Sequence, residues 1–175
     1  MVRAKLAGAL FGLALPVALA MPAAARSGLP GPSVPAAPGP APVSEQTLRA
    51  GAFRIADIPV YCGPVPTVVV PRLGDLAQAS PRPTQILLHP AFFEQDPLVQ
   101  FFVYGHQCAH VNGVKAEAQA DCAAIRLGLA MGWFTADTLP YLLEELERGV
   151  PGWTHSPGPQ RVRAILPCAH ARPPR

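Results

Sequence analysis

The sequence has no long run of apolar residues and no excess of charge of one sign. One uncharged apolar run, residues 6–20, is shorter than the roughly 20 residues that a membrane-spanning helix needs. The chain carries 14 Lys and Arg against 11 Asp and Glu, and the basic residues form no cluster. Without a basic patch there is no electrostatic footprint for nucleic acid. The composition therefore predicts a mature protein that neither spans a membrane nor binds DNA or RNA.

The first 25 residues have the pattern of a secretory signal peptide. The basic residues Arg3 and Lys5 precede the apolar stretch, and small residues then offer two cleavage sites, at Ala18/Ala20 and Ala23/Ala25. An uncleaved membrane anchor is the alternative, which the short apolar stretch disfavours. Cleavage after residue 25 leaves 12 Lys and Arg against 11 acidic residues, a net charge of +1. Together with the high Ala, Gly and Pro content, this pattern predicts a periplasmic or secreted bacterial protein.

The chain has four cysteines, and all of them follow the predicted signal peptide: Cys62, Cys108, Cys122 and Cys168. An even number of cysteines in an oxidising compartment predicts two disulfides. Four cysteines permit three pairings, and free buried thiols are the alternative.

Residues 26–43 are rich in proline and small residues, which disfavours regular structure and offers little to bury. We interpret them as a disordered linker, so that one folded domain spans residues 44–170. Within it, strand patterns precede helical ones, which predicts an α+β fold with a small β-sheet. The expected strands cover residues 67–70 and 84–88. The expected helices are a pair at 97–112 and about 114–131, followed by two C-terminal helices, one between Asp137 and Gly149 and one at about 156–166.

Two histidines in the first expected helix, His106 and His110, lie four residues apart. This spacing places both imidazoles on one helix face, about 5–6 Å apart at Cβ, so both can reach one ion. The turn at residues 112–113 reverses the chain and brings Glu117 opposite the histidines. Two neutral imidazoles and one carboxylate suit zinc and leave a fourth position open for water. Asp121, one turn further on, is placed to accept a hydrogen bond from a ligating histidine.

The pattern His106-x-x-x-His110 followed by Glu117-x-x-x-Asp121 resembles the gluzincin metallopeptidases. The likeness is to the minigluzincin-like peptidases, the CAAX prenyl proteases and the HtpX-type proteases, and it covers about residues 84–166. The resemblance implies a zincin-like helix pair, with zinc held by His106, His110 and Glu117 and with Asp121 orienting a histidine.

Two further segments carry the resemblance. The segment Thr154-His155-Ser156-Pro157, with Arg161 after it, is similar to a Thr-His-Pro segment near the C-terminus of those families. It implies that His155 donates a hydrogen bond to an oxyanion and that Arg161 pairs with Asp121, although a turn residue and a solvated arginine are the simpler alternatives. The strand that ends at His89 looks like their substrate-facing edge strand.

The family pattern has glutamate directly after the first histidine, where this chain has Gln107. That glutamate takes a proton from the attacking water and delivers it to the leaving amine, which a neutral amide cannot do. We therefore expect an exported zinc protein that is impaired as a peptidase and binds a peptide or protein segment. One alternative is an active metallopeptidase with another base, for which Glu94 is the candidate. The other is a disulfide-stapled structural domain without metal.

Cys108 comes two residues after His106 and therefore points about 200° away from it round the helix, which makes it a poor metal ligand. Cys122 lies on the facing helix directly after Asp121. We therefore expect a Cys108–Cys122 disulfide that staples the two ligand helices together. Cys62 and Cys168 would then join the two ends of the domain.

Overall fold

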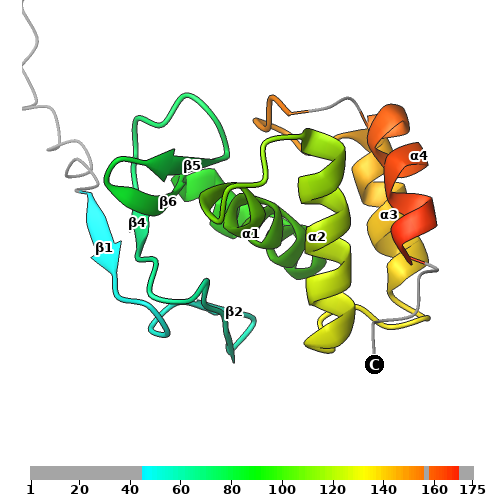
Figure 1. The fold of residues 1–175 in the computed structure, drawn as a ribbon, viewed down its shortest axis with the longest axis horizontal. Coiled ribbons are helices and arrows are strands. Elements are labelled where there is room, and N and C mark those ends of the chain that lie inside the picture. Colours follow the sequence, from blue (N-terminus) through cyan, green and yellow to red (C-terminus); the bar gives the residue numbers. More distant parts are fainter. Residues whose placement is uncertain (1–44, 156–157, 170–175) are drawn as a thin grey trace, which may run out of the picture. The chain divides into compact units, whose positions relative to one another are not determined.

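A computed structural model of the protein describes residues 45–155 and 158–169 (Figure 1). The expected signal peptide and linker lie outside the described residues. The described part contains a small mixed β-sheet and four α-helices, which confirms the α+β fold class. None of its helices has the length and apolar character that crossing a bilayer requires.

The main sheet has four strands in the order β1-β4-β6-β5. β4 and β6 are parallel, and the other two neighbouring pairs are antiparallel. Two further short strands form a separate hairpin. The strands are β1 (Gln46–Leu48), β2 (Arg54–Ile55), β3 (Ile58–Pro59), β4 (Thr67–Val69), β5 (Ala77–Pro81) and β6 (Thr84–Leu88).

Both expected strands are present in the sheet, but the strand that we expected at its edge lies inside it. β4 and β6 lie where their β-branched and apolar residues predict them, but β6 pairs on both sides and is an inner strand. The strand that ends next to His89 therefore has no free edge, and that expectation was wrong. β5 forms the edge instead. Its sequence, Ala-Gln-Ala-Ser-Pro, has no β-branched or aromatic residue, and it pairs antiparallel with β6.

The helices follow the sheet and confirm the four expected ones. They are α1 (Pro97–Val111), α2 (Glu117–Ala130), α3 (Leu139–Arg148) and α4 (Gly158–Ala169), with a 3₁₀ turn η1 (Pro90–Glu94) before α1. The Asp96 carboxylate caps α1 by accepting from the Leu98 N–H at 2.8 Å, and Gly113, with φ 94°, follows its C-terminus. α2 begins three residues later than expected, because Val114 is used in the turn, where its carbonyl accepts from His110.

α1 lies between the sheet and the other helices and is the most buried helix (Figure 1). Gly105 allows α2 to approach closely: a Cβ on Gly105 would stand 3.3 Å from Ala124. Ala120 and Ala124, on the facing side of α2, are fully buried. This close contact at small residues sets the distance at which side chains from the two helices meet.

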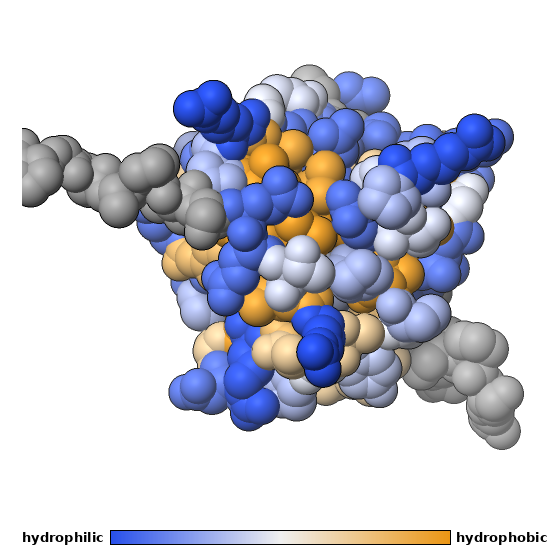
Figure 2. All heavy atoms as spheres, turned by 90° about the vertical axis from the view of Figure 1, so that its left-hand side faces the viewer, coloured by the Kyte–Doolittle hydropathy of each residue, from blue (hydrophilic) through white to orange (hydrophobic). Residues whose placement is uncertain are grey.

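The helices α1–α4 all lie on one side of the sheet in Figure 1. Figure 2 views the molecule from the other side, where apolar atoms gather between hydrophilic ones. The exposed large apolar side chains of the sheet half of the chain are Ile58, Tyr61 and Phe93. The buried core joins Ile86 and Leu88 of β6 to residues of all four helices.

Two disulfides join neighbouring segments, and their pairing corrects our expectation. Cys62 is bonded to Cys108, and Cys122 to Cys168, so the expected Cys108–Cys122 and Cys62–Cys168 bonds were wrong. Cys108 is bonded across to the segment after β3. Cys122 lies on the side of α2 that meets α4, where its Sγ is 3.7 Å from the Ala164 carbonyl oxygen. Cys108 is not part of any metal-ligating group of the described residues.

We expect peptide mapping without reductant to find Cys62 joined to Cys108 and Cys122 joined to Cys168. Both bonds have a sequence separation of 46. A double change, Cys122→Ser with Cys168→Ser, should lower the free energy of unfolding by about 2–4 kcal/mol, as measured by urea denaturation. Cys62→Ser with Cys108→Ser is the matched pair and should cost a similar amount. A peptide that joins Cys108 to Cys122 would contradict the structure.

Candidate metal centre

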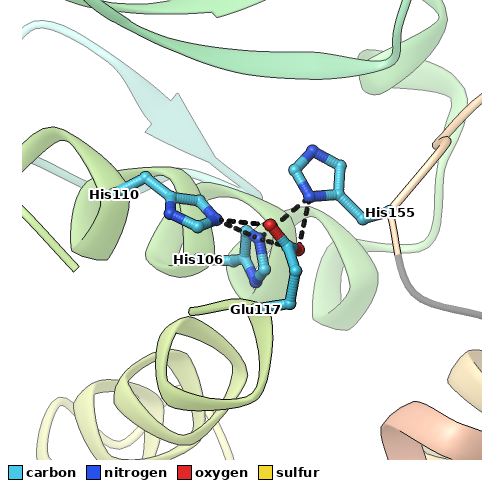
Figure 3. Close-up of side chains that lie close together, drawn as sticks. All are labelled: His106, His110, Glu117 and His155. Atoms are coloured by element: carbon cyan, nitrogen blue, oxygen red, sulfur yellow. Dashed lines mark hydrogen bonds and ion pairs between the residues drawn. The ribbon is translucent and has the colours of Figure 1, made fainter. Parts of the chain in front are cut away.

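His106 and His110 project from the same face of α1 towards the first residue of α2, Glu117. His106 Nε2 lies 3.3 Å from Glu117 Oε2, and His110 Nε2 lies 3.3 Å from Glu117 Oε1. The two Nε2 atoms are 2.9 Å apart. Figure 3 shows both rings directed at the carboxylate. The helix spacing and the turn after α1 thus bring the three predicted ligands together.

A fourth side chain, His155, enters the group from the segment between α3 and α4. Its Nδ1 lies 2.7 Å from Glu117 Oε2 and 3.3 Å from His106 Nε2 (Figure 3). One ligand atom from each of the four residues lies within 4.8 Å of all the others. Together His106, His110, Glu117 and His155 form a group that could hold a metal ion.

The outer nitrogens of both α1 histidines have acceptors that fix their tautomers. His110 Nδ1 lies 2.7 Å from the Val114 carbonyl, and His106 Nδ1 lies 2.7 Å from Asp121 Oδ1. A carbonyl or carboxylate oxygen only accepts, so each Nδ1 carries the hydrogen and donates it. The inner Nε2 atoms therefore present lone pairs to the same point as the Glu117 carboxylate. Such a convergence of acceptors is stabilised by a cation.

Asp121 is held in turn by Arg161, which lies on α4. Arg161 Nε donates to Asp121 Oδ2 at 3.1 Å, and both side chains are almost fully buried, at 4% and 1% exposed. The guanidinium lies 3.8 Å from the centre of the Trp153 ring, which stacks on it as a cation–π partner. Arg161 is thus a buried part of the support of His106 and not a solvated arginine.

Burial and charge shift the pKa values of two members of the group. Burial lowers the pKa of His106, and the neighbouring Asp121 only partly offsets this. Burial by itself raises the pKa of Glu117, but the hydrogen bond with His155 and the charges of the imidazoles outweigh it, so that this pKa is lowered. Both shifts favour the forms that ligate metals, a neutral imidazole and an ionised carboxylate.

Gln107 is buried at 1% exposure on α1, beside the group. Its amide nitrogen donates to the Ala77 carbonyl of β5 at 3.3 Å and lies 3.4 Å from His155 Nε2. Because a carbonyl can only accept, this contact requires an amide N–H and could not be made by a carboxylate. Gln107 thus ties α1 to the edge strand of the sheet.

A cavity of about 630 Å³ opens beside the group. Its walls come from β5, the end of α1 and the α1–α2 turn, and His110, Glu117 and His155 are among its lining residues. The lining residues are Gly74, Asp75, Gln78, Ala79, Pro81, Gln107, His110, Val111, Val114, Lys115, Glu117 and His155. Glu94, the base considered from the sequence, is exposed at the end of η1 and does not line this cavity.

Asp75 is a site residue that sequence reasoning missed. Its Oδ2 accepts from the Thr154 hydroxyl at 2.6 Å and lies 3.8 Å from His155 Nε2. No local pattern marks it, because residues 75 and 154 meet only in the folded chain. Comparison of the chain with protein-family models, curated proteins and solved structures gives no match.

Proposed function

We propose that this chain is an exported zinc-binding protein with a gluzincin-like site that lacks efficient hydrolytic activity and binds a peptide or protein segment. The ligand group supports the metal, and two disulfides favour an oxidising compartment such as the periplasm or the exterior. The proposal depends on one observation: the ligand group is complete, but the residue after its first histidine is the buried amide Gln107.

Zinc is the metal that this donor set suits best. Imidazole nitrogens and one carboxylate are ordinary zinc ligands, with bonds of about 2.0–2.2 Å. Ligand atoms at the corners of a tetrahedron of that size stand about 3.3–3.6 Å apart. His106 Nε2 lies 3.3 Å from both Glu117 Oε2 and His155 Nδ1. The His106–His110 and His155–Glu117 contacts, at 2.9 and 2.7 Å, are shorter and would have to lengthen around an ion. Zinc acts as a Lewis acid that polarises a carbonyl or acidifies water only where it keeps an open coordination position.

Gln107 argues against fast peptide hydrolysis. The residue after the first histidine is where a general base is needed, and an amide has no useful proton affinity at neutral pH. Loss of one general acid–base group typically costs about 10²–10⁴ in rate. Its amide is also committed to the Ala77 carbonyl, so the side chain supports the fold at this position.

The cavity supports binding of an extended segment. β5 forms one wall, and as an edge strand it has backbone groups that β6 does not pair. Such an edge accepts an added strand through main-chain hydrogen bonds. Side chains of the bound segment that enter the cavity would then lie next to the candidate metal ligands.

The test of impaired hydrolysis compares the zinc-loaded protein with the zinc-stripped protein on an unfolded protein substrate. We expect no zinc-dependent cleavage, because no base is in place for the attacking water. Product is measured by release of acid-soluble peptides over a time course. Cleavage that requires zinc in the wild-type protein would overturn this part of the proposal.

A second candidate function is that of an active metallopeptidase that uses Asp75 as its base. The observation in its favour is that the Asp75 carboxylate lines the cavity and faces His155. Against it, both carboxylate oxygens already accept hydrogen bonds from Thr154. If zinc-dependent cleavage is found, its loss in Asp75→Asn would identify this base.

A further inference from the structure

His155 stands inside the ligand group rather than beside it. Its Nδ1 is 2.7 Å from Glu117 Oε2 and 3.3 Å from His106 Nε2. Figure 3 shows its ring on the far side of the carboxylate from His110, with a ring nitrogen directed at the carboxylate oxygens. A side chain that served an oxyanion would stand one oxygen atom further out, about 2.8 Å beyond that oxygen. The contacts of His155 leave no such gap.

The segment that carries His155 is held in place from two sides. The Leu76 N–H donates to the Gly152 carbonyl at 2.8 Å. Thr154 donates its N–H and its hydroxyl to Asp75, at 3.1 and 2.6 Å. On the other side, the buried Trp153 packs edge-on against His106, with ring centres 5.0 Å apart. These contacts therefore fix the position of His155 relative to the other three residues of the group.

The outer nitrogen of His155 faces two polar groups. His155 Nε2 lies 3.4 Å from the Gln107 amide nitrogen and 3.8 Å from Asp75 Oδ2. The Asp75 carboxylate thus lies behind the ring without a hydrogen bond to it, and its Oδ2 accepts from the Thr154 hydroxyl. Without metal, the 2.7 Å contact with Glu117 Oε2 requires a hydrogen on Nδ1, which metal binding would displace.

From this geometry we infer that His155 Nδ1 is the fourth protein ligand of the metal, so that His106, His110, Glu117 and His155 close the coordination shell. The inference rests on the proposed metal site and extends it. Structural zinc sites are closed by four protein ligands, whereas catalytic sites keep one position for water. A closed site adds a second reason, independent of Gln107, for the absence of hydrolysis.

The test uses Co²⁺ as a spectroscopic probe and azide as a small ligand that needs an open position. Cobalt bound to the wild-type protein should show the intense visible absorption of a four-coordinate ion, and azide should leave that spectrum unchanged. In His155→Ala, cobalt should bind at least about 100-fold more weakly, beyond the 10–100-fold typical of an outer partner, and azide should shift the absorption bands. Circular dichroism checks that the variant is folded.

The outcomes separate this inference from the proposed function. Stoichiometric cobalt uptake with a wild-type spectrum that azide shifts would overturn the closed site and leave the metal proposal standing, and this result needs no variant. Equal cobalt affinity of the wild type and the folded His155→Ala variant would also show that His155 is not a ligand, and the metal proposal would stand. Failure of the folded wild-type protein to take up cobalt or zinc would overturn the proposed function and the inference together.

Discussion

Replacing His110 with alanine is expected to lower the zinc affinity of the protein by more than about 100-fold, beyond the loss typical of an outer partner of the site. His110 Nε2 lies 3.3 Å from Glu117 Oε1 and 2.9 Å from His106 Nε2, so its removal opens the group on one side. Zinc content after purification without chelator and competition with a coloured chelator measure the effect.

The matched control is His89→Ala. His89 lies outside the group, and its Nδ1 accepts from the Ala91 N–H at the start of η1. Its loss removes a cap worth about 1 kcal/mol and should leave zinc binding at one ion per chain. If neither the wild-type protein nor this control retains zinc, the chain is a disulfide-stapled domain without metal.

The change Asp121→Asn is expected to cost about 3–5 kcal/mol of stability, because it leaves the buried Arg161 guanidinium without its counter-charge. Among the described residues, Arg161 Nη2 has no hydrogen-bond partner, so the cation would be left against the Trp153 ring without a carboxylate. The carboxylate also holds the His106 tautomer through the 2.7 Å contact, and its loss should lower zinc affinity by about 10–100-fold. Urea denaturation of the zinc-free protein and chelator competition measure the two effects separately.

A second variant separates the two roles of Asp121, which are to neutralise Arg161 and to hold the His106 ring. Asp121→Asn combined with Arg161→Met removes the stranded cation and should recover much of the stability without recovering the zinc affinity. A stability loss below about 1 kcal/mol in Asp121→Asn, the range of solvated ion pairs, would show that the Arg161–Asp121 pair is not buried in solution. Recovery of full zinc affinity in the double variant would show that Asp121 does not act through His106.

Each disulfide holds a different segment against the helices of the metal group. Cys108 lies between His106 and His110 on α1 and is tied to Cys62 after β3. Cys122 follows Asp121 on α2 and is tied to Cys168 on α4, the helix that carries Arg161. Each bond thus restrains a helix that carries residues of the candidate ligand group, and none of the four cysteines belongs to that group.

The part of the site that the sequence predicted is the part made by neighbouring residues. Asp96 and Pro97 begin α1, and the turn at 112–113 ends it, so helix periodicity alone places His106 and His110 on one face. The same turn brings Glu117 within reach, and even the longer contact from His106 to Asp121 spans only 15 residues. Caps, turns and the 3.6-residue period determine such contacts locally.

The remaining contacts depended on the tertiary structure. His155 meets Glu117 across 38 residues. Arg161 meets Asp121 across 40, a pair that the family resemblance implied but that no local pattern specifies. Nothing in the sequence marked Asp75, which meets Thr154 across 79 residues. Cys108 was expected to pair with Cys122 but is bonded to Cys62. A helical period says which side chains share a face, but not which neighbour that face will meet. The packing of α1 against the sheet and of α2 against α4 determines which faces meet. That packing depends on the burial of apolar surface over the whole domain.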